Sequence, residues 1–152
     1  MNSFIITQLF LFATLVFLIS ASPLWQQDAQ LTASDKAAND QFGYSASVSG
    51  NIALVGAPFH PSGGVSESGA AFLYRSNDNG LTWPSSETQK LTASDKAAYD
   101  YFGRDVYVSG NIALIGAPYH ATGGLSRAGA AYLFRSNDNG LTWPSSETQK
   151  LT

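Results

Sequence analysis

The sequence predicts an all-β protein: two four-stranded antiparallel blades of a β-propeller, that is, a partial propeller, preceded by a hydrophobic signal helix. The first observation is a sixty-residue unit written twice, at 31–90 and 91–150, with forty-five identical positions. The second is that each copy contains four short strand-like stretches separated by turn residues. Repeats of this length built from strands are typical of propeller blades and not of helical solenoids. We therefore assign one blade to residues 31–90 and the next to residues 91–152.

The composition supports this fold class and excludes several functions. The chain has 152 residues, with 14 glycines and only 12% charged residues, as expected for an all-β protein with many turns. It contains no cysteine, which excludes disulfides, thiol catalysis and cysteine-ligated zinc. Its net charge is −3 and no cluster of Lys and Arg occurs, so no nucleic-acid partner is expected.

Residues 1–21 predict a secretory signal peptide and therefore a secreted, extracellular protein. The stretch 4–19 is apolar apart from three polar residues, and small residues follow it, with cleavage expected after Ala21. An uncleaved membrane anchor is the alternative, although a bilayer span takes about 20 apolar residues. Residues 22–30 form a linker. Because residues 27–32 resemble residues 87–92, this linker is also a candidate outer strand of a preceding blade.

The strands of each copy follow from their patterns of apolar residues. In the first copy, residues 44–49 alternate apolar and polar side chains, which predicts a strand with one apolar face. Gly50-Asn51 then forms a tight turn, because both residues tolerate positive φ. The continuous apolar run at 52–56 predicts a strand buried on both faces. The third strand is expected at 69–75 and the fourth at 88–92.

Two short motifs in each copy carry a family resemblance. Phe42-Gly43 precedes the first strand and Val55-Gly56-Ala57-Pro58 ends the second; they return as Phe102-Gly103 and Ile115-Gly116-Ala117-Pro118. These residues resemble the FG-GAP repeat of integrin α-chain propellers and related secreted proteins. The resemblance implies a propeller module for protein binding or cell adhesion. Since integrin α-chains close a ring with more than two blades, it also implies a homo-oligomer or further blades.

A second resemblance is nested inside each copy. The pattern Ser-x-Asp-x-Gly-x-x-Trp looks like the Asp-box of sialidases and related propellers, where it forms the hairpin between the third and fourth strands. Its residues here are Ser76, Asp78, Gly80, Trp83, Ser136, Asp138, Gly140 and Trp143. The Asp carboxylate can accept backbone N–H bonds, Gly tolerates positive φ and Trp packs over the hairpin. We interpret the box as a structural turn.

No pattern in the sequence predicts an enzyme or a cofactor. Several integrin α blades carry an Asp-rich calcium loop between the first two strands, but residues 48–52 hold no acidic side chain there. Calcium takes about six to eight oxygen ligands, so we expect no metal. Glycoside hydrolysis needs two carboxylates that converge on one bond, whereas Glu87 and Glu147 are equivalent positions on separate blades. We therefore expect a non-enzymatic protein.

The candidate binding residues lie in loops that share one face of a propeller, those from strand two to three and from strand four to the next blade. They are Phe59, His60, Tyr99, Tyr101, Tyr119, His120 and Arg127. Aromatic residues and Arg are enriched in binding hot spots. The two copies also differ in these loops, at 39/99, 41/101 and 67/127. Drift of relaxed loops after duplication is the alternative.

We expect the two loop histidines, His60 and His120, to be exposed or stacked on the neighbouring aromatic ring. No Asp, Cys or second His stands close to either of them in the sequence. A metal site at these positions is therefore not predicted.

The leading hypothesis is a secreted or cell-surface FG-GAP propeller module for protein binding or adhesion. One alternative is a carbohydrate-binding or glycosidase-related Asp-box protein. Another is a truncated structural remnant of a longer propeller that binds nothing. No motif specifies whether the ligand is a protein or a glycan.

Overall fold

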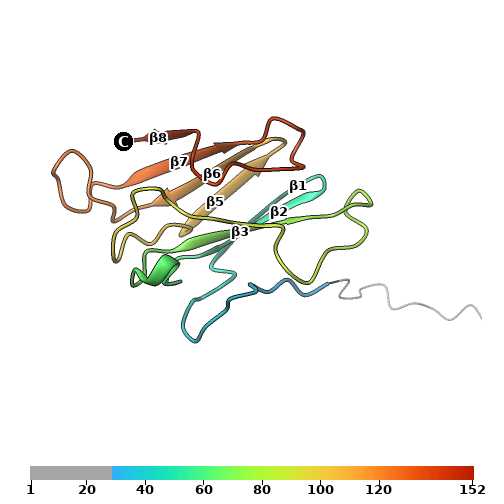
Figure 1. Ribbon diagram of the computed structural model, residues 1–152, viewed down its shortest axis with the longest axis horizontal. Helices are drawn as coiled ribbons and strands as arrows, with labels where there is room; N and C mark the ends of the chain where they lie inside the picture. Colours follow the sequence, from blue (N-terminus) through green and yellow to red (C-terminus); the bar gives the residue numbers. More distant parts are fainter. Residues whose placement is uncertain (1–28) are drawn as a thin grey trace, which may run out of the picture.

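The computed structural model describes residues 29–152 (Figure 1). The predicted signal peptide and most of the linker lie outside the described residues. Within 29–152 the chain forms two four-stranded antiparallel sheets and no α-helix. The predicted fold class, two blades of a β-propeller, is confirmed. No helix in this part of the chain is long and apolar enough to cross a membrane.

Each sheet is a meander whose strands follow one another in sequence order. The first sheet consists of β1 (Ser45–Ser49), β2 (Ile52–Ala57), β3 (Ala70–Arg75) and β4 (Gln89–Leu91). The second consists of β5 (Asp105–Ser109), β6 (Ile112–Ala117), β7 (Ala130–Arg135) and β8 (Gln149–Leu151). A short 3-10 turn, Ser62–Gly64, lies in the loop between β2 and β3. Because the strands alternate in direction, the β2–β3 and β6–β7 loops lie at the same end of the sheets (Figure 1).

The main hydrophobic core lies between the two sheets. The side chains that form it include Ile52, Leu54, Leu73 and Leu91 from the first sheet and Val108, Ile115, Tyr132 and Phe134 from the second. Each of them is at most 2% exposed. Burying one such side chain contributes about 1.5–3 kcal/mol to folding. The contact between the sheets is therefore the main source of stability.

The Phe-Gly and Gly-Ala-Pro motifs meet at the contact between the blades. Phe102 is completely buried, and it forms a parallel β-bridge with Gly69 of the first blade. A Cβ on Gly56 would lie 1.9 Å from the carbonyl oxygen of Gly103. A Cβ on Gly103 would lie 2.3 Å from the carbonyl oxygen of Ala70. Glycine is required at both positions because two backbones approach each other directly.

The serine face of β1, and not its apolar face, contacts the second blade. The backbone N–H of Val108 donates to Ser47 Oγ at 3.1 Å, and that of Gly110 donates to Ser49 Oγ at 3.1 Å. Val48 points to the opposite side and is 64% exposed. Its counterpart Val108 is only 2% exposed, because the first blade covers it. Among the described residues, the apolar face of β1 is therefore uncovered.

The candidate outer strand of a preceding blade does not appear among the described residues of that segment. Residues 29–32 are in no strand. Leu31 instead packs, half-buried, on the free face of the first blade together with Phe42 and Trp83. The part of the linker before residue 29 lies outside the described residues.

Candidate functional site

Four aromatic rings from both blades form a row at the loop end of the sheets, which we call the aromatic ridge: Tyr44, Phe59, Tyr101 and Tyr119. Tyr44 and Phe59 have ring centroids 6.5 Å apart, and Phe59 and Tyr101 are 4.9 Å apart. The Tyr101 and Tyr119 centroids are 5.1 Å apart. These distances and tilted orientations are those of favourable aromatic pairs. Tyr44 is 49% exposed and Tyr119 is 38% exposed, so the ridge presents ring surface to solvent.

Two arginines lie over the tyrosines of the aromatic ridge. The Arg104 guanidinium carbon is 5.9 Å from the centroid of Tyr44 and 5.7 Å from that of Tyr119. The guanidinium carbon of Arg127 is 5.4 Å from the centroid of Tyr119. Arg104 Nη1 also donates a long hydrogen bond, 3.5 Å, to the Tyr119 hydroxyl. Exposed cation–π contacts of this kind contribute about 0.5–1 kcal/mol each, and they leave the guanidinium groups accessible.

The backbone around the aromatic ridge is unusual. Tyr99, Tyr101 and Arg127 have φ of 66°, 56° and 57°. The equivalent residues of the first blade, Asn39, Gln41 and Glu67, have φ of 70°, 53° and 48°. Bulky side chains rarely adopt this left-handed conformation, and such residues cluster at functional sites at a cost of about 1–3 kcal/mol each. All three of these loop positions have positive φ in both blades and carry different residues in the two copies.

Hydrogen bonds between the blades hold these loops in place. The N–H of Tyr99 donates to the carbonyl of Ser66 at 3.0 Å, and the N–H of Phe102 donates to that of Ser68 at 3.0 Å. Beside them is an open hollow of about 660 Å³, whose lining includes Tyr99, Tyr101, Tyr119 and Arg127. The loop geometry therefore joins the aromatic ridge to a concave surface on the second blade.

The charges at the aromatic ridge follow from its contacts. Burial and a hydrogen bond to Glu67 raise the pKa of Tyr101 above its ordinary value. The hydrogen bond to Tyr119 raises the pKa of Arg104. The Tyr101 phenol is thus neutral and the Arg104 guanidinium is charged at neutral pH. The site presents positive charges beside neutral aromatic surface.

The comparisons with known proteins identify the repeat unit and show how it spans the two sheets. A model of the FG-GAP repeat family matches residues 25–74 and again residues 85–134, more than half of the chain. The chain belongs to the FG-GAP repeat family. The second match contains β4, β5, β6 and most of β7, so one FG-GAP unit runs from the outer strand of one sheet into the next sheet. A sequence search of curated proteins found no match.

The prediction that the FG-GAP loop histidines are exposed or stacked on the adjacent ring was wrong. His60 is 3% exposed and His120 is 6% exposed. Their Nδ1 atoms lie 3.0 Å from Asp40 Oδ2 and 2.8 Å from Asp100 Oδ2. Each carboxylate comes from twenty residues earlier in the chain, a distance at which the sequence gives no sign of contact. The histidines are therefore part of the scaffold and not of the exposed binding face.

Each histidine belongs to a group that we call the polar clasp, which consists of Asp35, Asp40, His60 and Lys90 in the first blade and Asp95, Asp100, His120 and Lys150 in the second. His60 Nε2 and Lys90 Nζ lie 3.3 Å and 2.5 Å from Asp35 Oδ2. Burial acts to raise the pKa of Asp35, but the hydrogen bond from Lys90 and the charge of His60 outweigh it and lower the pKa. The polar clasp ties the outer strand to the loop before β1. Sequence reasoning missed this group.

The Ser76–Trp83 segment folds as a tight turn between β3 and β4. Asp78 Oδ1 accepts hydrogen bonds from the Ser76 hydroxyl at 2.7 Å and from the Thr82 N–H at 2.8 Å. Asp78 Oδ2 accepts from the Thr82 hydroxyl at 2.6 Å. Gly80 has a φ of 88°. Ser136, Asp138, Gly140 and Trp143 stand at the equivalent positions of the turn between β7 and β8. Both oxygens of the carboxylate are occupied within the turn.

Glu87 and Glu147 each pair with a serine in the loop before the first strand of their blade. Glu87 accepts hydrogen bonds from the N–H and hydroxyl of Ser34, at 2.9 Å and 2.6 Å. Glu147 repeats this contact with Ser94 in the second blade. Within residues 29–152 no group of three or more His, Cys, Asp or Glu side chains is placed to hold a metal ion.

The structure brings together five of the seven candidate binding residues and separates two. Phe59, Tyr99, Tyr101, Tyr119 and Arg127 lie at the aromatic ridge or its hollow. The two histidines are buried below it. Sequence reasoning missed Tyr44 and Arg104, which complete the ridge from equivalent positions of the two copies. A signal was present, because this position is occupied by different residues in the two copies, Tyr44 and Arg104.

Proposed function

We propose that the chain is a non-enzymatic FG-GAP propeller module that binds a protein ligand through the aromatic ridge, in adhesion or a related recognition role. The predicted signal peptide places this role outside the cell, in a secreted or cell-surface form. The observation that carries the proposal is the row of exposed tyrosines with Arg104 and Arg127 above it. Tyr and Arg are the residues most enriched among binding hot spots.

The chemistry of the aromatic ridge suggests the kind of ligand. The guanidinium groups of Arg104 and Arg127 lie near tyrosine rings. Apart from the long bond from Arg104 Nη1 to Tyr119, their N–H groups can bind a carboxylate at two points. The nearby carboxylate of Glu67 is engaged by a hydrogen bond with Tyr101. We therefore propose a protein ligand that presents an Asp or Glu side chain next to an apolar or aromatic one.

The test is binding to a panel of purified extracellular domains, in parallel with a glycan array. Arg104→Ala and Arg127→Ala should each weaken binding to a protein ligand by about fivefold or more, as expected for hot-spot residues. Arg135→Ala is the matched control, because Arg135 lies exposed on β7 away from the ridge. The affinity of the Arg135→Ala variant for the protein ligand should equal that of the wild-type chain.

The alternatives make different predictions in the same assay. A carbohydrate-binding Asp-box protein would bind glycans, and its binding would depend on the turn residues instead of the arginines. A structural remnant would bind nothing on either panel. The proposal also requires no metal, so chelation with EDTA should leave ligand binding unchanged. Loss of binding after chelation, or binding that is insensitive to both arginine variants, would contradict it.

A further inference from the structure

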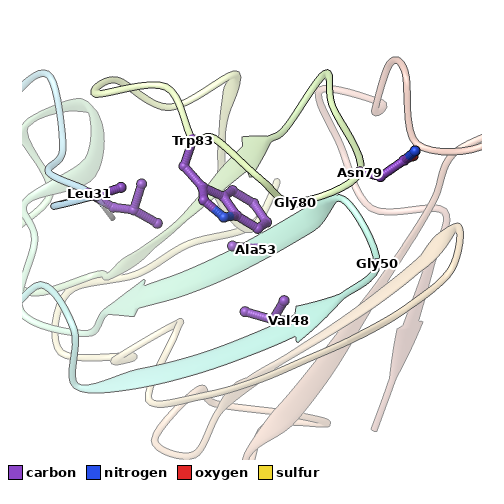
Figure 2. A pocket seen from close by; sticks show the side chains of 8 residues that line it. Leu31, Val48, Gly50, Ala53, Asn79, Gly80 and Trp83 are labelled. Carbon is purple, nitrogen blue, oxygen red and sulfur yellow. The ribbon is translucent and has the colours of Figure 1, made fainter. Parts of the chain in front are cut away.

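The free face of the first blade carries an open apolar hollow of about 610 Å³, which we call the Trp83 socket. Its lining includes Leu31, Val48, Ala53, Gly80 and Trp83. Figure 2 shows the Trp83 ring beside Ala53, with Leu31 next to it and Val48 on the neighbouring strand. Val48 is 64% exposed. An apolar hollow of this kind in a sheet face indicates a place for another side chain.

The same socket occurs sixty residues later, and there it is filled. Its lining residues Leu91, Val108, Ala113 and Trp143 are at most 6% exposed and belong to the core between the blades. The occupant is Ile52 of the first blade, whose Cδ1 lies 2.2 Å from the position that a Cβ on Gly140 would take. The internal contact thus identifies the side chain that the socket accepts: the first residue of the second strand of a neighbouring blade.

The free face of the second blade presents that side chain. Ile112, Leu114, Ala131, Leu133 and Leu151 are the counterparts of the residues with which the first blade covers its neighbour. All five residue types are identical between the copies. The first-blade counterparts are at most 2% exposed, whereas Leu151 is 41% exposed and the other four are half-buried. The second blade therefore carries an uncovered copy of a surface that is buried between the blades.

We propose that a second copy of this chain docks head to tail on the first and places its Ile112 in the Trp83 socket. The contact repeats the one between the two blades. The Phe42-Gly43 motif would then enter the open hollow of about 580 Å³ on the second blade, which Gly116 and Gly129 line. This hollow is the counterpart of the place where Phe102-Gly103 docks on the first blade.

Two positions of β5 make the contact between copies weaker than the internal one. Tyr107 replaces Ser47, whose hydroxyl accepts the Val108 N–H between the blades at 3.1 Å, and Asp105 replaces Ser45. The Ser45 hydroxyl donates to the Gly103 carbonyl at 2.9 Å. Asp105 replaces this serine in the second blade, and an ionised carboxylate can only accept hydrogen bonds. The docked copy therefore places a carboxylate beside the carbonyl of Gly43, which is unfavourable. The affinity between copies should therefore be lower than it would be with a serine at position 105.

Head-to-tail docking uses two different surfaces, so successive copies form a ring when the rotation between blades closes. Propellers contain about four to eight blades, so between about two and four copies would close one. This inference does not rest on the proposed ligand binding, because self-association is measured without a ligand.

The experiment is sedimentation velocity of the purified full chain over a range of concentrations. Val48→Lys blocks the socket and Ile112→Lys removes the side chain that fills it, and each should weaken association at least about tenfold. Leu81→Lys is the control. Leu81 and its counterpart Leu141 are 76% and 53% exposed, so this position stays outside the contact whether or not a blade covers it. Asp105→Ser restores the hydroxyl donor and should strengthen association.

Mixing the variants tests the head-to-tail geometry directly. The Val48→Lys chain keeps an intact second-blade face, and the Ile112→Lys chain keeps an intact socket. An equimolar mixture should form a heterodimer that neither variant forms alone. The proposal is overturned if the chain is monomeric at every concentration, if association is insensitive to both lysines, or if the mixture associates no better than its components. Circular dichroism of each variant confirms that it is folded.

Discussion

Ile52 of the first blade occupies the space next to Gly140 of the second: its Cδ1 atom lies 2.2 Å from where a Cβ on Gly140 would be. A Cβ on Gly80, the counterpart in the first blade, would have the Gly50 carbonyl oxygen as its nearest neighbour, at 3.5 Å. Both glycines have positive φ, 81° at Gly140 and 88° at Gly80. The two positions thus share one backbone requirement and differ only in whether a neighbouring blade covers them.

Alanine at these two glycines should therefore have unequal effects. Gly80→Ala is expected to lower the free energy of unfolding by about 1–2 kcal/mol, the cost of a left-handed conformation for a residue with a Cβ. Gly140→Ala adds about 1–3 kcal/mol, because it overpacks the contact with Ile52. Urea denaturation at low protein concentration measures both values.

A double-mutant cycle separates packing from backbone strain at Gly140. Ile52→Val removes the Cδ1 atom that a new methyl group would meet. We expect Ile52→Val to recover part of the loss caused by Gly140→Ala and none of that caused by Gly80→Ala. Strict additivity in both combinations would show that the side chain of Ile52 does not fill this space.

Two tyrosines that look alike in burial should respond in opposite ways to loss of their hydroxyl groups. Tyr74 and Tyr132 are both completely buried. The Tyr132 hydroxyl donates to Asp95 Oδ1 at 2.8 Å, whereas the Tyr74 hydroxyl has no hydrogen-bond partner among the described residues. Tyr132→Phe should cost about 1–2 kcal/mol of stability, and Tyr74→Phe should be neutral or stabilising. Thermal or urea unfolding distinguishes them, and equal losses would contradict the assignment.

The turn aspartates make stability depend on pH in the acid range. The hydrogen bond from Thr82 is the main cause that lowers the pKa of Asp78 from 3.8 to about 2. The hydrogen bond from Ser136 does the same for Asp138, whose pKa is also about 2. A folded-state pKa below the unfolded value stabilises the fold above pH 3.8, and this stabilisation is lost as the pH falls toward 2.

The measurement compares the wild-type chain with Asp78→Asn and Asp138→Asn as a function of pH. The difference in the free energy of unfolding between the wild-type chain and each variant should be constant above about pH 4. It should shrink as the pH falls toward 2. A difference that persists unchanged at pH 2 would show that the carboxylates are not ionised partners of the turn. The two variants serve as replicates, because the turn has the same hydrogen bonds in each blade.

The polar clasp should be essential for stability. Asp100 Oδ2 pairs with His120 Nδ1 and also accepts the N–H of Ala97 at 2.6 Å. Asp100→Ala leaves both groups without this partner, and a lost hydrogen bond to a charged group costs about 1.5–3 kcal/mol. Lys36→Ala, at an exposed position, should change stability by less than about 0.5 kcal/mol. Equal effects of the two substitutions in urea unfolding would exclude the role assigned to Asp100.

Much of the fold can be read locally. The strand positions, the Gly50-Asn51 turn and the turn at Ser76–Trp83 follow from patterns that span fewer than about ten residues. The continuous apolar run of β2 correctly indicates a strand buried on both faces. The repeat itself identifies the architecture, because a blade cannot cover its own faces and needs a neighbour.

The candidate site could be predicted only in part. Aromatic and Arg residues in the loops give a correct indication of where the aromatic ridge lies, since such loops meet at one end of a meander. The histidines were misplaced because their carboxylate partners lie twenty residues away in the sequence. Tyr44 and Arg104 were missed because each was considered only as part of a strand.

The sequence alone determined the all-β architecture, the two-fold repetition and the glycines at which the chain must turn, because these depend on local conformational preferences. The tertiary structure decided which surfaces are covered. Ile52 is buried and Ile112 is half-buried, and Val108 is buried while Val48 is exposed. The residues in each pair are identical, so only the presence of a neighbouring blade distinguishes them. Contact between elements far apart in the chain, and not the identity of a residue, decides what is core and what is free to bind.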